Sequence, residues 1–254
     1  MNYISIYKHK IDIFVKVCAK LSRERYVTGN GGNLAWKLED DLILISPTQL
    51  NKGDITEADV TFITTQGVKV EGEREPSGET PMHLNFFKER PDITSVIHCH
   101  PSWTNSFAIS KEENWLMHPI FPETTTEVGP VPLVPYAEPL TQDLADNFLP
   151  FIRKYNAFLM ENHGLVVMSP LDIEWTFQLV ELLEMSSLSI VQALKLGSIK
   201  ELSKEDLMNL DNLMKTRNLP MFGAPGLNES LVDLYFPDSS QDRILDKRQT
   251  HSIA

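Results

Sequence analysis

The stretch Thr94-Ser95-Val96-Ile97-His98-Cys99-His100-Pro101 is an apolar run that ends in two histidines and a proline. The run predicts a buried β-strand over residues 95–99. Side chains two residues apart on a strand share one face, so His98 and His100 should project together, with Cys99 on the opposite face. Paired imidazoles of this kind indicate a divalent-metal site, because histidine is the commonest metal ligand. Two histidines satisfied by backbone carbonyls are the structural alternative.

A third histidine follows another apolar run. His163 lies in Glu161-Asn162-His163-Gly164, directly after Ala157-Phe158-Leu159-Met160, and by itself it would be interpreted as a turn residue. Catalytic zinc sites typically use three protein ligands and leave one position open for water or substrate. We therefore predict that His98, His100 and His163 bind one metal ion.

One acidic residue, Glu79, stands just ahead of a predicted helix that begins near Pro81. We predict that its carboxylate lies beside the metal, as a further ligand and as the general base. A carboxylate that only stabilises the helix dipole is the alternative. His83 follows one helical turn later on the same face, and we interpret it as a packing or supporting residue rather than a ligand.

The chain has 254 residues and a net charge of −12, with 42% hydrophobic and 23% charged residues. This composition is ordinary for a globular protein. The negative charge argues against nucleic acid and an anionic membrane as partners. No apolar stretch approaches the roughly 20 residues that a membrane helix needs. Cys18 and Cys99 stand far apart, so we expect no disulfide framework and a reducing, cytoplasmic location.

Apolar periodicity predicts both helices and strands. Helices are expected over 11–25, 81–90 and 170–196, with Ser169 as the N-cap of the last one and Pro170 at its first position. Strands are expected over 42–45, 60–63, 69–70, 95–99, 131–134, 157–160 and 165–168. The pattern favours a three-layer α/β/α domain with a central, mostly antiparallel sheet. We predict one domain over residues 1–254, with a flexible C-terminal tail at about 237–254.

Gly29-Asn30-Gly31-Gly32-Asn33 forms a glycine-rich loop after the first predicted helix. Unhindered glycines let several backbone N–H groups converge on an anion such as phosphate, and a flexible surface connection is the alternative. The loop is not a P-loop, because it lacks Gly-Lys-Ser/Thr and follows a helix. The hydroxyl groups of Ser46, Thr48 and Ser77 are further candidates for binding the same anion.

Six segments, in this order, resemble the class II aldolase and adducin family. They cover roughly residues 10–197 and are Gly29-Asn30-Gly31-Gly32-Asn33, Ile45-Ser46-Pro47-Thr48, Glu75-Pro76-Ser77-Gly78-Glu79, Ile97-His98-Cys99-His100-Pro101, Val134-Pro135-Tyr136 and Glu161-Asn162-His163-Gly164. The metal enzymes of the family include fuculose-phosphate aldolase and ribulose-phosphate 4-epimerase. The resemblance implies an α/β/α fold, assembled as a homotetramer with active sites between neighbouring subunits.

Carried over residue by residue, the resemblance implies that His98, His100 and His163 bind zinc and that Glu79 is the acid/base carboxylate. Manganese, cobalt or iron would suit the same ligands. The residues at or beside the family's phosphate- and substrate-binding positions are Asn30, Gly32, Asn33, Ser46, Thr48, Ser77 and Gly78.

The implied reaction is metal-dependent cleavage of a short ketose 1-phosphate, of the fuculose-, rhamnulose- or deoxypentulose-phosphate type, to dihydroxyacetone phosphate and a small aldehyde. Glu79 favours cleavage, because the epimerases usually carry aspartate there. A sugar-phosphate 4-epimerase or decarboxylase is the second interpretation. A non-catalytic adducin-like scaffold is the third, although adducin-like members lack the metal histidines. A Schiff-base route would need a lysine in a dry pocket, and no lysine falls in a matching segment.

The sequence departs from the fuculose aldolase pattern at Asn30, Gln49 and Gly78, where threonine, glycine and serine are common. All three positions belong to the phosphate pocket in the resemblance. The region near Phe121 and Glu123 departs from the segment that carries the aldolases' intersubunit tyrosine. Residues 122–126, Pro-Glu-Thr-Thr-Thr, look more like family branches of unassigned or deoxysugar-phosphate specificity.

Overall fold

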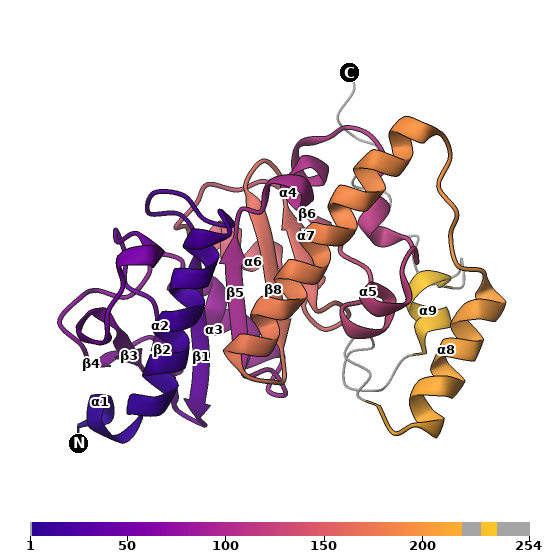
Figure 1. The fold of residues 1–254 in the computed structure, drawn as a ribbon. Coiled ribbons are helices and arrows are strands. Elements are labelled where there is room, and N and C mark those ends of the chain that lie inside the picture. The colour runs from indigo at the N-terminus through magenta and orange to yellow at the C-terminus, as the bar shows by residue number, and fades with distance from the viewer. Residues whose placement is uncertain (1, 220–229, 238–254) are drawn as a thin grey trace.

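The computed structural model describes residues 2–219 and 230–237, and the strands of these residues form one sheet (Figure 1). The strands are β1 (Asn33–Glu39), β2 (Leu42–Ile45), β3 (Thr61–Ile63), β4 (Lys69–Glu71), β5 (Ser95–Cys99), β6 (Leu133–Val134), β7 (Ala157–Met160) and β8 (Gly164–Ser169). Their order across the sheet is β4-β3-β2-β1-β5-β8-β7-β6. All pairs are antiparallel except β6 with β7, which confirms the prediction of a mostly antiparallel sheet.

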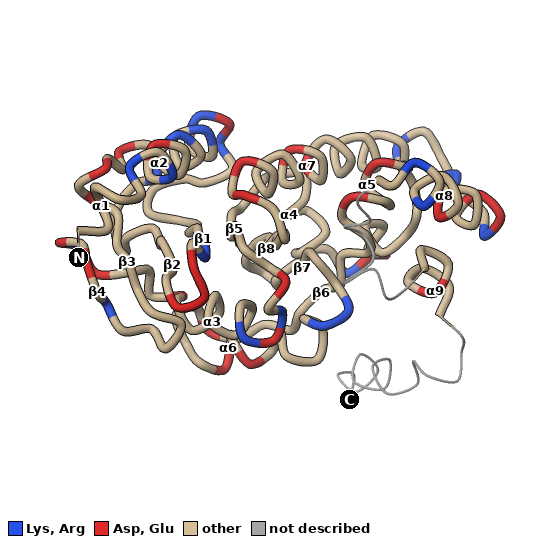
Figure 2. Tube along the Cα trace, turned by 90° about the horizontal axis from the view of Figure 1, so that it is seen from below, with Lys and Arg blue, Asp and Glu red and all other residues tan. Residues whose placement is uncertain are grey.

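Helices cover both faces of the sheet (Figure 2). α2 (Lys8–Arg23) and α7 (Ile173–Leu196) lie on one face, and α3 (Thr80–Glu89) and α6 (Gln142–Asn147) lie on the other. The remaining helices are α1 (Tyr3–Ile6), α4 (Ser102–Ile109), α5 (Pro122–Glu127), α8 (Lys204–Thr216) and α9 (Leu231–Tyr235), with 3₁₀ turns η1 (Lys52–Asp54), η2 (Glu57–Asp59) and η3 (Trp115–Met117). The three-layer α/β/α fold is confirmed.

The two faces of β5 belong to two different hydrophobic clusters. Ile97 and Cys99 are buried in the cluster that includes α2 and α7, whereas Val96 packs with Phe86 of α3 in the other. Successive strand residues point to opposite faces, so His98 lies on the same face as Val96, toward the α3 layer. The predicted separation of Cys99 from the two histidines is therefore confirmed for His98.

Strand register brings several polar side chains to the end of β5. Asn33, the first residue of β1, pairs with His98, and cross-strand partners share a face. On the other side of β5, β8 is joined to β7 by a tight turn in which Met160 pairs with Gly164. Asn162 in that turn has φ 55°, a left-handed conformation that asparagine tolerates. The turn delivers His163 to the same end of the sheet.

The expected start of the long helix is wrong. α7 begins at Ile173, and Asp172 is its N-cap. Ser169 instead ends β8, and its hydroxyl oxygen accepts a hydrogen bond from the Leu171 amide at 3.0 Å. Pro170 therefore lies in the connection between strand and helix rather than at the first helical position.

Two helices that the sequence analysis did not predict follow α7. α8 begins with a capping box in which Ser203 and Asp206 satisfy each other's backbone amides. The Leu231 amide at the start of α9 donates to the Asp211 carboxylate on α8, at 3.1 Å. The tail predicted at about 237–254 lies outside the described residues, apart from Pro237. Among the helices described, none is both long and apolar enough to cross a membrane.

Candidate metal centre and substrate cavity

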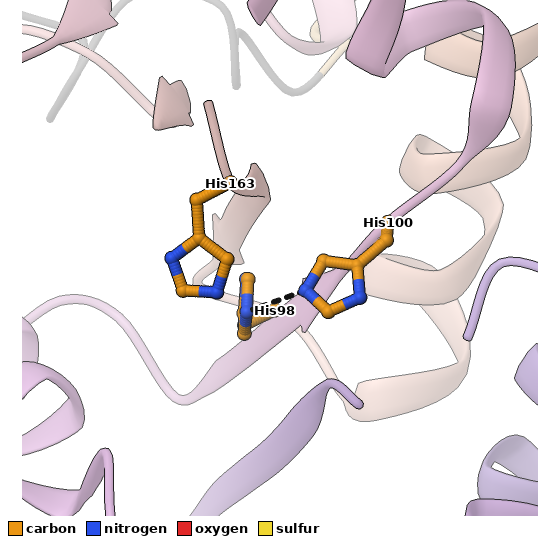
Figure 3. Close-up of side chains that lie close together, drawn as sticks. All are labelled: His98, His100 and His163. Atoms are coloured by element: carbon orange, nitrogen blue, oxygen red, sulfur yellow. Dashed lines mark hydrogen bonds between the residues drawn. The ribbon is translucent and has the colours of Figure 1, made fainter. Parts of the chain in front are cut away.

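Three imidazole rings meet at the end of β5 (Figure 3). His98 lies on β5, His100 follows the strand, and His163 comes from the β7–β8 turn. The centroid of the His98 ring lies 4.8 Å from the centroid of the His100 ring and 4.8 Å from that of the His163 ring. The His100 and His163 centroids lie 5.4 Å apart. One potential ligand atom from each ring lies within 4.8 Å of the others. The structure therefore brings together all three histidines that the sequence singled out.

The hydrogen bonds of the rings leave the right atoms free for a cation. His98 Nδ1 lies 3.0 Å from the Leu165 carbonyl oxygen, which can only accept, so Nδ1 carries the proton and Nε2 keeps its lone pair. That Nε2 lies 3.1 Å from His100 Nε2. His163 Nδ1 is buried and has no hydrogen-bond partner. The Leu165 carbonyl thus fixes the tautomer of His98, and the ring nitrogen atoms of the three histidines lie close together. Both features suit the binding of a divalent metal ion.

Burial keeps all three imidazoles neutral. It lowers the pKa of His98 well below its usual value, and the neighbouring His163 adds to the effect. It lowers the pKa of His100 to about 3, with further contributions from His98 and His163, and it lowers the pKa of His163 as well. An imidazole must be neutral to bind a metal ion. These rings are already neutral near pH 7, so they do not have to release a proton when an ion binds.

The Glu79 carboxylate faces the imidazoles. Its Oε2 lies 3.5 Å from His98 Nε2, and its Oε1 lies 3.8 Å from His163 Nε2. The Asn33 amide donates to Glu79 Oε2 at 2.7 Å, and His83 Nε2 lies 2.5 Å from Asn33 Oδ1. These contacts form a buried chain from His83 through Asn33 to Glu79. Burial lowers the pKa of His83 to about 4, so the ring is neutral and donates to the amide oxygen through Nε2.

The glycine-rich loop lies directly against the histidines. A Cβ added at Gly31 would come within 2.9 Å of the His100 ring, and one at Gly32 would lie 2.8 Å from the His98 carbonyl oxygen. Gly32 also has φ +70°, which favours glycine. The Gly31–Gly32 end of the loop is therefore packed against the histidines, and the segment just before the loop is joined to them because the His100 amide donates to the Tyr26 carbonyl at 2.6 Å.

Two further predicted segments are joined by backbone hydrogen bonds. The Thr48 amide donates to the Glu75 carbonyl at 3.0 Å, and the Ser77 amide donates to the Ser46 carbonyl at 3.1 Å. This pairing holds the two segments together around the Pro47–Pro76 bridge, and Thr48 and Ser77 both line the cavity described below. Ser46 is different: it is fully buried, and its hydroxyl oxygen accepts from the Leu34 amide at 3.0 Å. Its side chain is thus occupied in the fold, and it does not line the cavity described next.

A cavity of about 140 Å³ opens beside the imidazoles. Its lining contains the three histidines, Glu79 and six of the seven predicted substrate-binding residues, Ser46 being the exception. The residues that line it are Asn30, Gly31, Gly32, Asn33, Pro47, Thr48, Gln49, Lys52, Ser77, Gly78, Glu79, His98, His100, Leu140 and His163. The amide groups of Gly32 and Gly78 donate to no acceptor in the described part of the chain. Free amides and hydroxyl groups suit the oxygens of an anionic, hydroxylated ligand.

Three lining residues, Gln49, Lys52 and Leu140, lie outside the six segments that carry the family resemblance. Lys52 is the cationic one, and it follows the Ser-Pro-Thr segment without belonging to any motif. Leu140 contacts the position of Gly78, where an added Cβ would lie 2.9 Å from its Cδ2. Gln49 has φ 55°, so the left-handed backbone remains although glycine is absent. Only Gln49 had a sequence signal, as a departure from the family pattern.

Comparison with known proteins agrees with this geometry. Residues 13–188 match the family model described as Class II Aldolase and Adducin N-terminal domain. A 5-deoxy-D-ribulose 1-phosphate aldolase from Bacillus thuringiensis serovar kurstaki is 30% identical over 184 residues, covering 72% of this chain and 84% of that protein. A 3-oxo-tetronate 4-phosphate decarboxylase from Pectobacterium atrosepticum is 29% identical over 155 residues, covering 60% and 71%.

A solved structure gives the same result for the fold. An L-fuculose 1-phosphate aldolase superposes with a TM-score of 0.70 and 28% identity, covering 80% of this chain and 95% of that one. The family match spans most of the chain and contains every residue of the metal centre. This chain belongs to the class II aldolase and adducin family and is one of its enzymes.

Proposed function

We propose that the protein is a divalent-metal-dependent lyase that breaks a carbon–carbon bond in a short phosphorylated keto sugar. The leading substrate class is a ketose 1-phosphate of the fuculose-, rhamnulose- or deoxypentulose-phosphate type, cleaved to dihydroxyacetone phosphate and a small aldehyde. One observation carries the proposal: three neutral imidazoles and the Glu79 carboxylate converge on a cavity lined by free amide and hydroxyl groups.

The metal centre determines the type of chemistry. His98, His100 and His163 would hold the ion. Because these ligands are neutral, the ion would keep its full positive charge and could act as a Lewis acid toward the ketone oxygen of the substrate. We propose zinc, because three nitrogen ligands with one open position are typical of catalytic zinc. Glu79 lies within 4 Å of two of these rings and is held by the Asn33 amide, so it is placed to move a proton at the carbon next to the ketone.

The remaining residues bind and orient the substrate. The amides of Gly32 and Gly78 and the hydroxyl groups of Thr48 and Ser77 would hold the phosphate at one end of the cavity. In a retro-aldol cleavage the hydroxyl beyond the breaking bond would lose its proton to water, and the bond electrons would remain on the carbon beside the ketone. Glu79, after taking up a proton from water, would deliver it to that carbon. Fixed donors for the phosphate position this carbon against the carboxylate.

Decarboxylation is the second candidate, and the 29% identical 3-oxo-tetronate 4-phosphate decarboxylase favours it. Both substrates share the skeleton phosphate–CH₂–C(=O)–CH(OH)–X. The group X leaves as an aldehyde in one reaction and as carbon dioxide in the other, and both leave dihydroxyacetone phosphate once the carbon is protonated. The cavity residues described above interact with the shared part, so they serve either reaction.

A substrate panel tests the proposal. The purified protein is incubated with fuculose, rhamnulose and deoxypentulose 1-phosphates and with 3-oxo-tetronate 4-phosphate, and dihydroxyacetone phosphate is measured by a coupled assay. Aldehyde release supports the aldolase, and carbon dioxide release supports the decarboxylase. An epimerised sugar phosphate without any three-carbon product contradicts bond cleavage. No turnover of any sugar phosphate with added zinc, manganese, cobalt or iron contradicts the proposed function.

Glu79→Gln separates the base from the metal ligands. We expect the variant to retain its metal content and to lose turnover by about 10²–10⁴-fold, because the amide cannot transfer the proton. Cleavage at the parent rate would contradict the assignment of Glu79.

We further propose a homotetramer with its active sites between subunits, as the family resemblance implies, and a cytoplasmic location. The first is tested by light scattering of the purified protein. A monomer that turns over sugar phosphates at full rate would contradict the intersubunit site.

A further inference from the structure

Lys52 is a buried lysine that forms no ion pair within the described part of the chain. Its side chain lies in η1 and is 1% exposed, and its Nζ donates to the Leu50 carbonyl at 2.9 Å and to the Asn30 carbonyl at 3.3 Å. Among the described residues, no carboxylate lies within ion-pair distance of this ammonium group. Burying a charge without a counter-ion is costly, so a fold does not acquire one for stability.

The backbone beneath Lys52 is fixed by packing. The Asn51 side chain accepts a hydrogen bond from the Gly53 amide at 2.8 Å, which closes the turn. A Cβ at Gly53 would lie only 2.7 Å from Ser22 Oγ on α2, so the turn is pressed against that helix. The position of the Lys52 side chain is therefore built into the fold rather than chosen from several exposed rotamers.

Lys52 lines the substrate cavity, and its two carbonyl acceptors belong to the segments that form the cavity wall. The Asn30 carbonyl is in the glycine-rich loop, next to Gly31 and Gly32, and the Leu50 carbonyl follows Gln49. An ammonium group has three N–H donors, and these two carbonyls use two of them. Among the described residues that line the cavity, Lys52 is the only lysine or arginine.

Three further donors of the cavity wall have no acceptor within the described part of the chain. The amides of Gly32 and Gly78 and the hydroxyl of Thr48 form no hydrogen bond within the described part of the chain. The overall charge of −12 repels a free anion, and a cation inside the cavity offsets this repulsion locally. A cation and several unused donors that share one cavity match a phosphate dianion, which offers oxygen acceptors in several directions.

We propose that Lys52 binds the phosphate of the substrate and thereby selects phosphorylated sugars over neutral ones. This inference rests on the proposed function and adds the residue that supplies the charge. Ser46 is buried in the fold and supplies no donor to the cavity. Lys52 reaches the cavity from a different turn, outside the six motif segments.

Calorimetry with inorganic phosphate tests the proposal without requiring turnover. The full-length, metal-loaded protein is titrated with phosphate and compared with Lys52→Met, Lys52→Arg and Lys16→Met. Lys16 is exposed on α2, so its variant removes the same charge away from the cavity. We expect Lys52→Met to bind phosphate at least about tenfold more weakly, Lys52→Arg to stay within about threefold of the parent, and Lys16→Met to be unchanged. If Lys52→Met does not fold, Lys52→Gln, which keeps a donor for the two carbonyls, takes its place.

Three outcomes would overturn the proposal. The first is equal phosphate affinity of the parent and Lys52→Met, as expected if phosphate binds the metal alone. The second is no phosphate binding by the parent at millimolar concentrations. The third is a covalent adduct on Lys52 after borohydride treatment with dihydroxyacetone phosphate, which would make Lys52 a nucleophile instead. Phosphate binding that depends on Lys52 in a protein that turns over no sugar phosphate would support this inference while contradicting the proposed function.

Discussion

Gly164→Ala should disrupt the metal centre while leaving the fold in place. An added Cβ at Gly164 would lie 2.6 Å from His100 Cδ2, 2.8 Å from His98 Cε1 and 2.7 Å from the Cys99 carbonyl oxygen. Because carbon atoms pack at about 3.5 Å or more, both rings must move by roughly 0.7–0.9 Å. Metal–ligand distances tolerate only about 0.2 Å, so the rings can no longer share one ion. Overpacking of this kind costs about 1–3 kcal/mol of stability.

The effect on metal binding is measured by competition with a chromogenic chelator, and the stability of the metal-free proteins is measured by urea unfolding. We expect a loss of affinity of at least about 10–100-fold, equivalent to roughly 1.4–2.7 kcal/mol. Gly29→Ala is the matched control: Gly29 has φ +56°, but nothing lies within 4 Å of an added Cβ. It should lose about 1 kcal/mol of stability and keep the parent metal affinity. Parent-like metal affinity in Gly164→Ala would refute the proposed arrangement of the rings.

Three other perturbations have defined outcomes. Burial alone would lower the pKa of His118, but the hydrogen bonds that its ring donates to Glu113 and Glu201 outweigh burial and raise the pKa. The resulting stabilisation is complete below about pH 6.5 and is lost as the pH rises through the pKa of His118 in the folded protein. Glu201→Gln should therefore lower the free energy of unfolding in urea by roughly 0.5–1 kcal/mol at pH 6 and by less at pH 9. Equal losses at both pH values would contradict this prediction. Glu184 accepts hydrogen bonds from two backbone amides at the start of α4, so Glu184→Ala should cost about 2–3 kcal/mol in urea unfolding, and an unchanged midpoint would argue against the capping role. His83→Leu should reduce kcat by about 10–100-fold without changing metal content, because the Asn33 amide that holds the Glu79 carboxylate loses its hydrogen bond to His83. An unchanged kcat would show that the contacts from His83 through Asn33 to Glu79 do not matter for catalysis.

Local patterns predicted the fold where burial and sequence period agree. β2 is a continuous apolar run and β5 has an apolar centre, and every residue of both strands is buried. β1 was missed because it starts inside the glycine-rich segment and mixes Trp36 with Lys37 and Glu39, which weakens the strand pattern. The start of α7 was misplaced because Ser169 followed by Pro170 resembles a helix start, although hydrogen bonding along β8 extends that strand to Ser169.

The convergence of the three histidines could be predicted because each follows an apolar run, and the strand ends that carry them meet at one edge of the sheet. The contacts that support them could not be predicted. Asn33 and Glu79 are 46 residues apart, and His83 and Asn33 are 50 apart, so only the packing of α3 against the sheet brings them together. Lys52 could not be predicted for the same reason. Its proposed role in phosphate binding depends on a turn that packs against α2, and this packing has no local sequence signal.

Metal analysis of the purified protein tests the central claim most directly. Untagged protein is dialysed, incubated with zinc, manganese, cobalt or iron, separated from free ion and examined by elemental mass spectrometry, alongside His98→Ala and the exposed-site control Lys16→Met. The account predicts about one ion per chain in the parent and in the control, and a large loss in His98→Ala. A parent protein that retains none of these ions, or a His98→Ala variant that retains as much as the parent, would contradict it.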